Sequence, residues 1–240
     1  MQPAGRRYTA GAPRAGRDLP PTASGGAAHG PEGGREHGVR LLHLRDRMLR
    51  EAALPAAGLL ATDMTADRAA ELLRTEGLAQ LRIAARNAPA QTVLTGPDDQ
   101  LAAVRHTARA LGHRATPLTS RTAYHHPLLT EVHRAFRRLL RAQPVAPPAL
   151  AVYTATTDRP VRTPAGLRTA AAAHLTEPMA FHRTLRALSR AGFTTYLDSG
   201  PRALLSTLAR AVLPGCATAA PSRTPAGVDR LRHRLTAVLT

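Results

Sequence analysis

The chain has 240 residues, of which 43% are hydrophobic, enough for one large domain or two small ones with a buried core. Its formal net charge is +17, and all 33 basic residues are arginine, an excess that attracts acidic proteins, nucleic acids and phosphate-bearing molecules. The single cysteine, Cys216, excludes an internal disulfide framework and a cysteine-based zinc site. Because no apolar run is long enough for a membrane span or a signal-peptide core, we expect a cytoplasmic protein without a membrane partner.

The positive charge is only partly a signal about partners. Arginine in place of every lysine, with a single isoleucine and a single asparagine, is typical of a GC-rich genome. Aromatic residues make up 3% of the chain and are scattered, so the stacking platform of many nucleic-acid-binding proteins is lacking. The composition therefore disfavours nucleic acid as a partner.

The N-terminal segment differs in composition from the rest. Residues 1–37 are rich in Gly, Pro, Ala and Arg and have neither helical nor strand periodicity. Such a segment buries too little apolar surface to offset its ordering entropy, so we predict that it is disordered and of low complexity. From Val39 to Leu49, apolar residues recur at near-helical spacing, which predicts an amphipathic helix over 36–53.

Residues 58–120 follow the order strand, helix, strand, strand, helix, strand, which is that of a ferredoxin-like βαββαβ subdomain. Thr65 is the expected N-cap of the first helix, and Gly77 and Gly112 are the expected ends of the two helices. The predicted strands are 58–64, 81–87, 91–96 and 113–119, and the predicted helices are 65–77 and 98–112.

After residue 120, helices alternate with short strands. Pro127 falls in the first turn of a predicted helix, where its missing N–H costs nothing. The predicted helices are 125–143, 164–175, 178–191, 201–212 and 225–239, and the predicted strands are 149–155 and 194–198. This pattern predicts an α/β fold in which residues 38–57 and 121–240 form a partial core, with too few strands for a doubly wound sheet.

Four motifs along the chain carry a family resemblance. They are VRLLHLRDRM (39–48), RIAARNAPAQTVLTG (82–96), TAYHHPLL (122–129) and YLDSGPRALLSTL (196–208). In this order they resemble segments of the acyl-CoA:acyl-carrier-protein transacylases, which include malonyl transacylases and the acyltransferase domains of polyketide synthases. The resemblance implies a partial α/β-hydrolase-like acyltransferase fold into which the ferredoxin-like subdomain is inserted.

The family's reaction is ping-pong transfer of an acyl or malonyl group from CoA to the phosphopantetheine thiol of an acyl carrier protein, through an acyl-serine. The resemblance therefore implies an acyltransferase of polyketide or fatty-acid biosynthesis, with acyl-CoA as substrate and no bound cofactor. The implied partners are an acyl carrier protein and other synthase domains.

The resemblance also assigns candidate site residues. His125 matches the general base, and His126 falls where the family usually has serine; without the resemblance, both histidines would equally suit the solvated start of a helix. Arg45 matches the arginine that binds the substrate carboxylate, although an arginine-rich chain places arginine at many helical positions. Asn87 matches the family's N-x-P, where it could bond near the active site or hold an Asx-type turn, the reading we favour.

The remaining family positions concern specificity and orientation of the base. Tyr124 takes the usual place of a phenylalanine, which favours malonyl, whereas Thr122 matches neither common specificity pattern, so the acyl group stays open. Some family members have a glutamine near Ala180 that orients the histidine, and alanine cannot do so.

The sequence contains no candidate for the family's nucleophile. No G-x-S-x-G occurs in the chain, Ser24 lies in a Gly-rich run, and Ser199 lacks the motif's first glycine. We therefore expect the chain to be inactive alone, either because the gene is truncated or frameshifted or because a separate polypeptide supplies the nucleophile-bearing half.

Two other functions remain open from the sequence. The chain could be a non-catalytic docking module whose arginines bind an acidic carrier protein, or, with less support, a basic nucleic-acid-binding protein. A histidine metal site is disfavoured, because His125 and His126 are adjacent and His133 lies well beyond the usual i, i+4 spacing.

Overall fold

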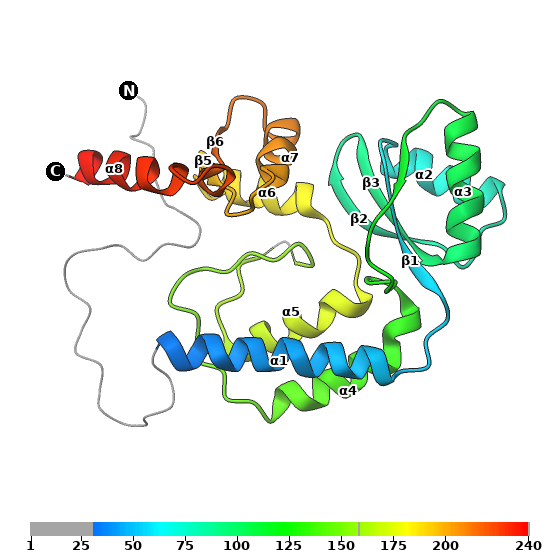
Figure 1. The fold of residues 1–240 in the computed structure, drawn as a ribbon, viewed down its shortest axis with the longest axis horizontal. Coiled ribbons are helices and arrows are strands. Elements are labelled where there is room, and N and C mark those ends of the chain that lie inside the picture. The colour runs from blue at the N-terminus through cyan, green and yellow to red at the C-terminus, as the bar shows by residue number, and fades with distance from the viewer. Residues whose placement is uncertain (1–30, 158, 240) are drawn as a thin grey trace.

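The computed structural model describes residues 31–157 and 159–239, which form the mixed α/β structure of Figure 1. A small sheet with two helices lies beside a group of long helices, and a third group joins short helices to a two-stranded sheet. The elements are α1 (Pro31–Glu51), β1 (Ala57–Thr62), α2 (Ala66–Thr75), β2 (Arg82–Ala88), β3 (Gln91–Pro97), α3 (Asp98–Ala110), β4 (Ala115–Pro117), η1 (Pro127–Leu129), α4 (Thr130–Arg141), α5 (Pro164–Thr176), α6 (Phe181–Arg190), β5 (Thr195–Leu197), α7 (Leu204–Val212), β6 (Ala217–Ala219), η2 (Pro221–Arg223) and α8 (Gly227–Leu239).

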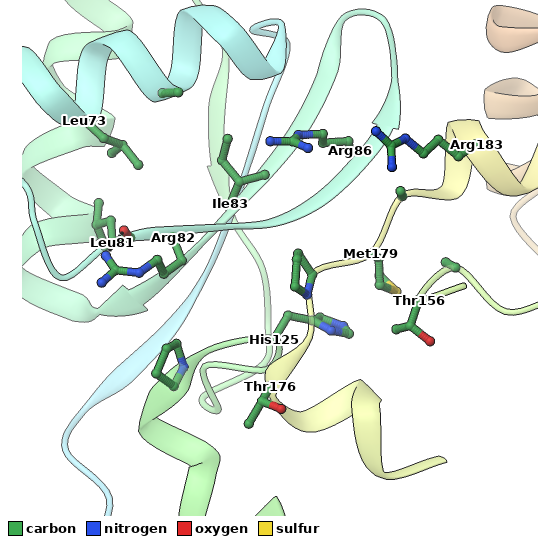
Figure 2. Close-up of a pocket in the computed structure, with 15 residues that line it drawn as sticks. Leu73, Leu81, Arg82, Ile83, Arg86, His125, Thr156, Thr176, Met179 and Arg183 are labelled. Carbon is green, nitrogen blue, oxygen red and sulfur yellow. Dashed lines mark hydrogen bonds between the residues drawn. The ribbon is translucent and has the colours of Figure 1, made fainter. Parts of the chain in front are cut away.

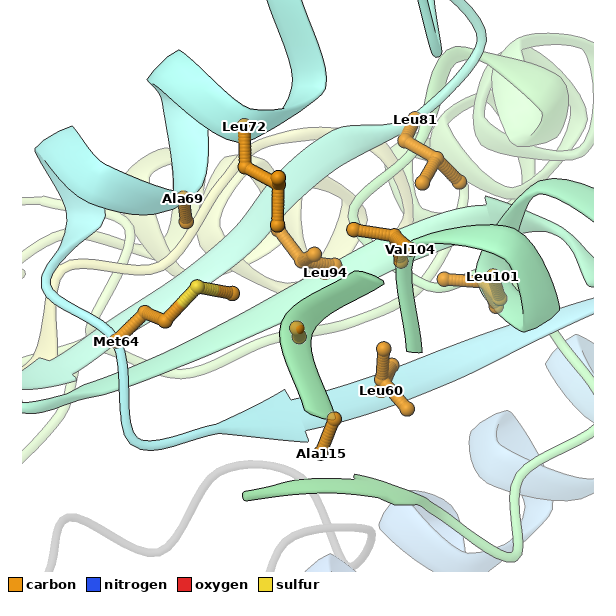
Figure 3. Close-up of a cluster of buried hydrophobic side chains, with 10 residues drawn as sticks. Leu60, Met64, Ala69, Leu72, Leu81, Leu94, Leu101, Val104 and Ala115 are labelled. Atoms are coloured by element: carbon orange, nitrogen blue, oxygen red, sulfur yellow. The ribbon is translucent and has the colours of Figure 1, made fainter. Parts of the chain in front are cut away.

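The small sheet has the strand order β2-β3-β1-β4, with all neighbouring strands antiparallel. Its elements run β1-α2-β2-β3-α3-β4 along the chain, as predicted for residues 58–120. Leu60, Leu94 and Val104 are almost fully buried at the centre of the cluster between the sheet and its helices (Figure 3). Alternating apolar residues on the strands and an apolar stripe on each helix account for this packing.

The predicted helix ends in this unit are confirmed. The Thr65 hydroxyl accepts a hydrogen bond from the Arg68 N–H at 3.2 Å and so caps α2. Gly77 and Gly112 follow the two helices with φ of 64° and 81°, a conformation that glycine adopts without steric cost.

The helical group consists of α1, α4 and α5, and its core contains Leu49, Leu129, Phe136 and Leu175. Helix α1 begins at Pro31, so its first turns include residues 31–37 of the segment for which the sequence predicts disorder. Residues 1–30 of that predicted segment lie outside the described residues.

The part of the chain after α4 differs most from the prediction. The predicted strand 149–155 is reduced to one antiparallel bridge between Val152 and Val161, in a segment that follows Pro147 and Pro148. Proline donates no hydrogen bond and restricts the residue before it, which works against a regular ladder there. Strand β6 was not predicted; it pairs with β5 in parallel.

No helix in the described part of the chain combines the length and apolar character needed to cross a membrane.

Candidate active site

A cleft of about 600 Å³ lies where the small sheet faces the segments around residues 125, 155 and 180 (Figure 2). Ile83 and Met179 supply apolar surface to the cleft, and Thr156 and Thr176 supply hydroxyl groups. His125 lines the same cleft, and Figure 2 places its ring beside Met179 and Thr156. The cleft therefore brings a titratable side chain to a mostly apolar wall, as is common in ligand sites.

His125 is held in one tautomer by the main chain. Its Nδ1 lies 2.6 Å from the carbonyl oxygen of Glu177, and because a carbonyl can only accept, Nδ1 carries the proton. The Nε2 lone pair is thereby left to accept a proton from another group. His125 has a φ of 62°, a left-handed conformation that costs a non-glycine residue roughly 1 kcal/mol or more, and such strain is found at functional sites.

The surroundings of His125 favour its neutral form. The residue is only 9% exposed, and burial lowers the pKa of its imidazole below the usual 6.5. The hydrogen bond to the Glu177 carbonyl partly opposes this effect, while the positive charge of a protonated His174 lowers the pKa of His125 further. A neutral imidazole with a free Nε2 is the state required of a general base.

His174, which the sequence analysis missed, interacts with two predicted site residues, His125 and Arg45. Its ring meets that of His125 edge-on, with the centroids 5.9 Å apart and the planes at 62°. Burial and then the charge of Arg45 lower the pKa of His174. The one signal in the sequence was a polar residue within the run of alanines in α5.

Arg45 and Tyr124 lie together, and the charge of Arg45 acts on His174. The Arg45 guanidinium carbon is 5.7 Å from the centre of the Tyr124 ring, a cation–π distance. The Arg45 Nε is buried and has no hydrogen-bond partner among the described residues, and neither Arg45 nor Tyr124 is among the residues that line the cleft. Two contacts, His125 with His174 and Arg45 with Tyr124, are thus linked by the charge of Arg45 acting on His174.

His126 has a structural role. It is 5% exposed, its Nε2 donates to the Gln80 carbonyl at 2.7 Å, and its Nδ1 accepts from the Leu128 N–H at 3.1 Å. Both ring nitrogens are therefore occupied, and the residue caps the short helix η1. Adjacent histidines thus have different environments, one facing the cleft and one locked into the fold.

The absence of a glutamine at Ala180 does not leave His125 without an orienting partner. The side chain of Ala180 cannot orient the imidazole, and the main-chain carbonyl of Glu177 takes this role. The segment after Glu177 is clamped to the small sheet: the Met179 N–H donates to the Ala84 carbonyl at 2.8 Å, and the Arg86 N–H to the Met179 carbonyl at 2.9 Å. The small sheet thereby fixes the partner of the histidine.

Asn87 is not brought to the cleft. It lies where the pairing of β2 with β3 shifts register, between Arg86 and Ala88, and it is not among the residues that line the cleft. This position is that of a β-bulge next to a hairpin turn.

The fourth motif builds a helix terminus. Asp198 is 4% exposed, and its carboxylate accepts from the N–H groups of Gly200 at 2.8 Å and Ser206 at 3.1 Å. Ser199 is exposed and is not among the residues that line the cleft. Within the described residues, no group of three or more His, Cys, Asp or Glu side chains is placed to hold a metal ion.

The geometry defines an α/β fold with a sheet-lined cleft and a buried, carbonyl-oriented histidine, and solved structures share this fold. The malonyl-transacylase structure described as "PlMCAT:AntF (holo): type II PKS acyl-carrier protein in complex with its malonyl-transacylase" matches with a TM-score of 0.75 at 18% identity, over 82% of this chain and 65% of that one. The acyl-carrier-protein S-malonyltransferase of Burkholderia pseudomallei matches with a TM-score of 0.73 at 22% identity, over 81% of this chain and 64% of that one. The acyltransferase domain of the second salinomycin polyketide synthase module matches with a TM-score of 0.67 at 23% identity, over 80% and 46%.

Sequence relatives narrow the class further. The chain is 30% identical over 178 residues to polyketide synthase GfsA of Streptomyces halstedii, covering 73% of this chain and 2% of the synthase. It is 28% identical over 180 residues to the polyketide biosynthesis protein ThaF of Burkholderia thailandensis, covering 75% of this chain and 15% of that protein. No family model matches. The resemblance to malonyl transacylases and polyketide synthase acyltransferase domains is confirmed, and the chain spans a small part of these curated relatives.

Proposed function

We propose that the chain is part of an acyltransferase of polyketide or fatty-acid biosynthesis, which moves an acyl or malonyl group from CoA to the phosphopantetheine thiol of an acyl carrier protein. The observation that carries this proposal is the neutral His125, whose Nδ1 is held by the Glu177 carbonyl and whose Nε2 is left for proton transfer. The sequence relatives and the transacylase fold support the same reaction class.

In the proposed mechanism, His125 Nε2 takes the proton of a serine hydroxyl as its oxygen attacks the acyl thioester. The tetrahedral adduct expels CoA thiolate, which receives the proton back from the imidazolium, and an acyl-serine remains. The carrier's thiol then loses its proton to Nε2 and attacks the acyl-serine, and the serine leaves with that proton. Because this chain contains no G-x-S-x-G, we propose that it is inactive alone and that a separate nucleophile-bearing half supplies the serine.

Arg45 and Tyr124 are the proposed substrate-binding residues. A malonyl carboxylate would bind the Arg45 guanidinium, whose planar fork suits a carboxylate and whose Nε lacks a partner among the described residues. Tyr124 holds the guanidinium through its ring face. Asn87 belongs to the bulge and turn of β2 in this proposal, as its position outside the cleft lining favours.

We propose the following domain organisation. Residues 58–120 form a ferredoxin-like subdomain, which the strand order β2-β3-β1-β4 supports, and residues 38–57 and 121–240 form the partial acyltransferase core. An acyl carrier protein is the proposed partner, by analogy with the transacylase structure that is described as a complex with its carrier protein.

Incubation with labelled malonyl-CoA tests the reaction. The chain alone should take up no covalent label, and label that survives denaturation would show that a residue of this chain acts as nucleophile. Coexpression with a G-x-S-x-G-bearing half should give labelled serine, and His125→Asn should abolish that labelling. A reconstituted pair that labels equally well with asparagine at residue 125 would overturn the assignment of the base.

Ligand selectivity tests Arg45 without the nucleophile. We expect the chain to bind malonyl-CoA more tightly than acetyl-CoA by about tenfold, the value of one charge-assisted hydrogen-bond pair. Arg45→Ala should remove this preference, whereas Arg40→Ala, on the same helix and exposed, should leave it intact. Equal affinities in the unaltered chain would refute carboxylate binding.

A further inference from the structure

The segment that carries the Glu177 carbonyl is held by a contact that the proposed mechanism does not use. Thr176, the last residue of α5, lines the cleft together with His125 (Figure 2). Its hydroxyl oxygen lies 2.8 Å from Nδ1 of His133 on α4, a hydrogen-bond distance. We propose that His133 is a positioning residue for the general base: through Thr176 it fixes the end of α5, and thereby the carbonyl that holds the His125 imidazole. This inference rests on the proposed function, in which His125 is the base.

The contact between Thr176 and His133 joins two separate helices. The hydroxyls of Thr75, Thr107 and Thr207 each bond to the main-chain carbonyl four residues earlier, which is the local choice open to a helical threonine. The Thr176 hydroxyl instead meets a side chain of another helix, and both residues are partly buried. Because water competes less for a partly buried hydrogen bond, this contact restrains the end of α5 against α4.

Apolar packing beside this bond makes α4 a firm support. Val132 and Phe136 of α4 and Leu175 of α5 are buried in one cluster. His133 and Thr176 each come directly after a residue of this cluster, so their polar contact lies next to close-packed side chains. Packing of this kind restricts the movement of one helix relative to the other.

The carbonyl is also restrained on its other side. Pro178 follows Glu177 and confines it to an extended conformation, with φ of −84° and ψ of 137°. The Met179 N–H then donates to the Ala84 carbonyl at 2.8 Å. The carbonyl thus lies between an anchor on β2 and an anchor on α4, and His133 provides the second. Loss of the α4 anchor frees one end of this segment, so the carbonyl no longer stays in line with the imidazole.

Nitrogen NMR of the imidazole groups, recorded on the full chain, reads the state of His125 directly. In the unaltered chain we expect the Nδ1–H tautomer, with the signal assigned by its loss in His125→Asn. Thr176→Val removes the hydroxyl with little change in shape, and His133→Phe removes the ring nitrogens. In both variants we expect a mixture of the two tautomers and a lower pKa of His125, because the bond to the Glu177 carbonyl raises that pKa.

Conservative variants and a control on the same helix separate positioning from a general loss of stability. Thr176→Ser and His133→Asn each keep a polar atom for the bond and should restore most of the single tautomer. Thr169→Val, at an exposed position of α5 outside the cleft lining, should change neither the tautomer nor the pKa of His125. The titratable and charged side chains around His125 are kept in all of these variants, namely His174, the adjacent Glu177 and the cleft-lining Arg82, Arg86 and Arg183.

A single tautomer with an unchanged pKa of His125 in Thr176→Val would overturn the proposal, and so would an equal change in Thr169→Val. Circular dichroism shows whether each variant is folded. If His133→Phe does not fold, the result for Thr176→Val decides alone.

Acyl transfer by the pair reconstituted with a nucleophile-bearing half gives a second readout. His133 is not among the residues that line the cleft, so His133→Phe should lower kcat on the order of tenfold and leave KM unchanged. The loss should be partial, because the His126 N–H still donates to the Leu175 carbonyl at 3.2 Å and holds the end of α5 in part. A fall in kcat that His133→Asn does not reverse would count against the positioning role.

Failure of this inference can be distinguished from failure of the proposed function. A change of tautomer in the variants, with no acyl transfer by the unaltered reconstituted pair, would refute the acyltransferase reaction and keep the positioning role. Acyl transfer by that pair, with the tautomer of His125 unchanged in the variants, would refute the positioning role and keep the reaction.

Discussion

Replacement of His126 by alanine tests whether this histidine serves the fold and not the chemistry. The imidazole is 5% exposed and spans two main-chain groups from distant parts of the chain, donating to the Gln80 carbonyl at 2.7 Å and accepting from the Leu128 N–H at 3.1 Å. It thereby joins the small sheet unit to the start of the helical group. Alanine would remove both bonds and leave a void behind.

The expected cost follows from these contacts. Each lost hydrogen bond contributes about 1 kcal/mol, and the buried groups left unpaired together with the void add about 1 kcal/mol or more. We therefore expect His126→Ala to lower the free energy of unfolding by about 3 kcal/mol, a large share of the roughly 5–15 kcal/mol typical of a domain.

Urea denaturation followed by circular dichroism measures this change. His106→Ala, an exposed histidine on α3, is the control and should change the free energy of unfolding by less than about 0.5 kcal/mol. His126→Asn keeps an acceptor for the Leu128 N–H and should lose roughly half as much as alanine. If His126→Ala loses no more than the control, the structural role assigned to this residue is wrong.

Three further predictions concern pH, packing and the cap of α7. In the folded chain the pKa values of the histidines at 125, 126 and 174 are lowered from 6.5, so the unfolded chain takes up protons first as the pH falls. The melting temperature should therefore be highest above about pH 6.5 and fall as the pH drops through the lowered pKa values. A flat profile from about pH 7.5 to about pH 5 would contradict this prediction. Gly96→Ala should lower the free energy of unfolding, measured by urea denaturation, by about 2–4 kcal/mol, because an added Cβ would lie 2.7 Å from the Leu81 side chain and 2.9 Å from the Gln80 carbonyl. A Cβ added at Gly38 meets nothing within 4 Å, so Gly38→Ala should be neutral or stabilising. Asp198→Ala should lower stability by about 2 kcal/mol and speed amide hydrogen exchange at Ser206, and unchanged exchange there would rule out the cap.

The regular elements were predictable where periodicity and end signals agreed. Thr65, Gly77 and Gly112 marked helix ends correctly, because capping and left-handed termini depend on local chemistry. Strand β6 was not predicted, because Ala217–Ala219 has no alternating pattern of apolar and polar residues. Its strand conformation depends on pairing with β5, which the local sequence does not reveal. The converse holds for Val152, where an apolar run suggested a strand but no continuous neighbour pairs with it.

The candidate site was predictable in part. A motif resemblance singled out His125, Arg45 and Tyr124; His125 lines the cleft, whereas Arg45 and Tyr124 contact each other outside its lining. The Glu177 carbonyl could not be found in this way, because a main-chain acceptor has no signature in the side-chain sequence. His174 was missed for a related reason, as its role comes from the packing of α5 and not from its neighbours in sequence.

The bonds between Met179 and β2 also cover part of an edge of the small sheet. Strand β2 is at one edge of the four-stranded sheet, where unpaired main-chain groups would invite a strand from another molecule. Bonds to Met179 occupy part of that edge, and the opposite edge, β4, is only three residues long and ends in Pro117. The segment that orients the histidine thus also blocks an edge of the sheet, so a substitution that loosens it would expose a surface for intermolecular strand pairing.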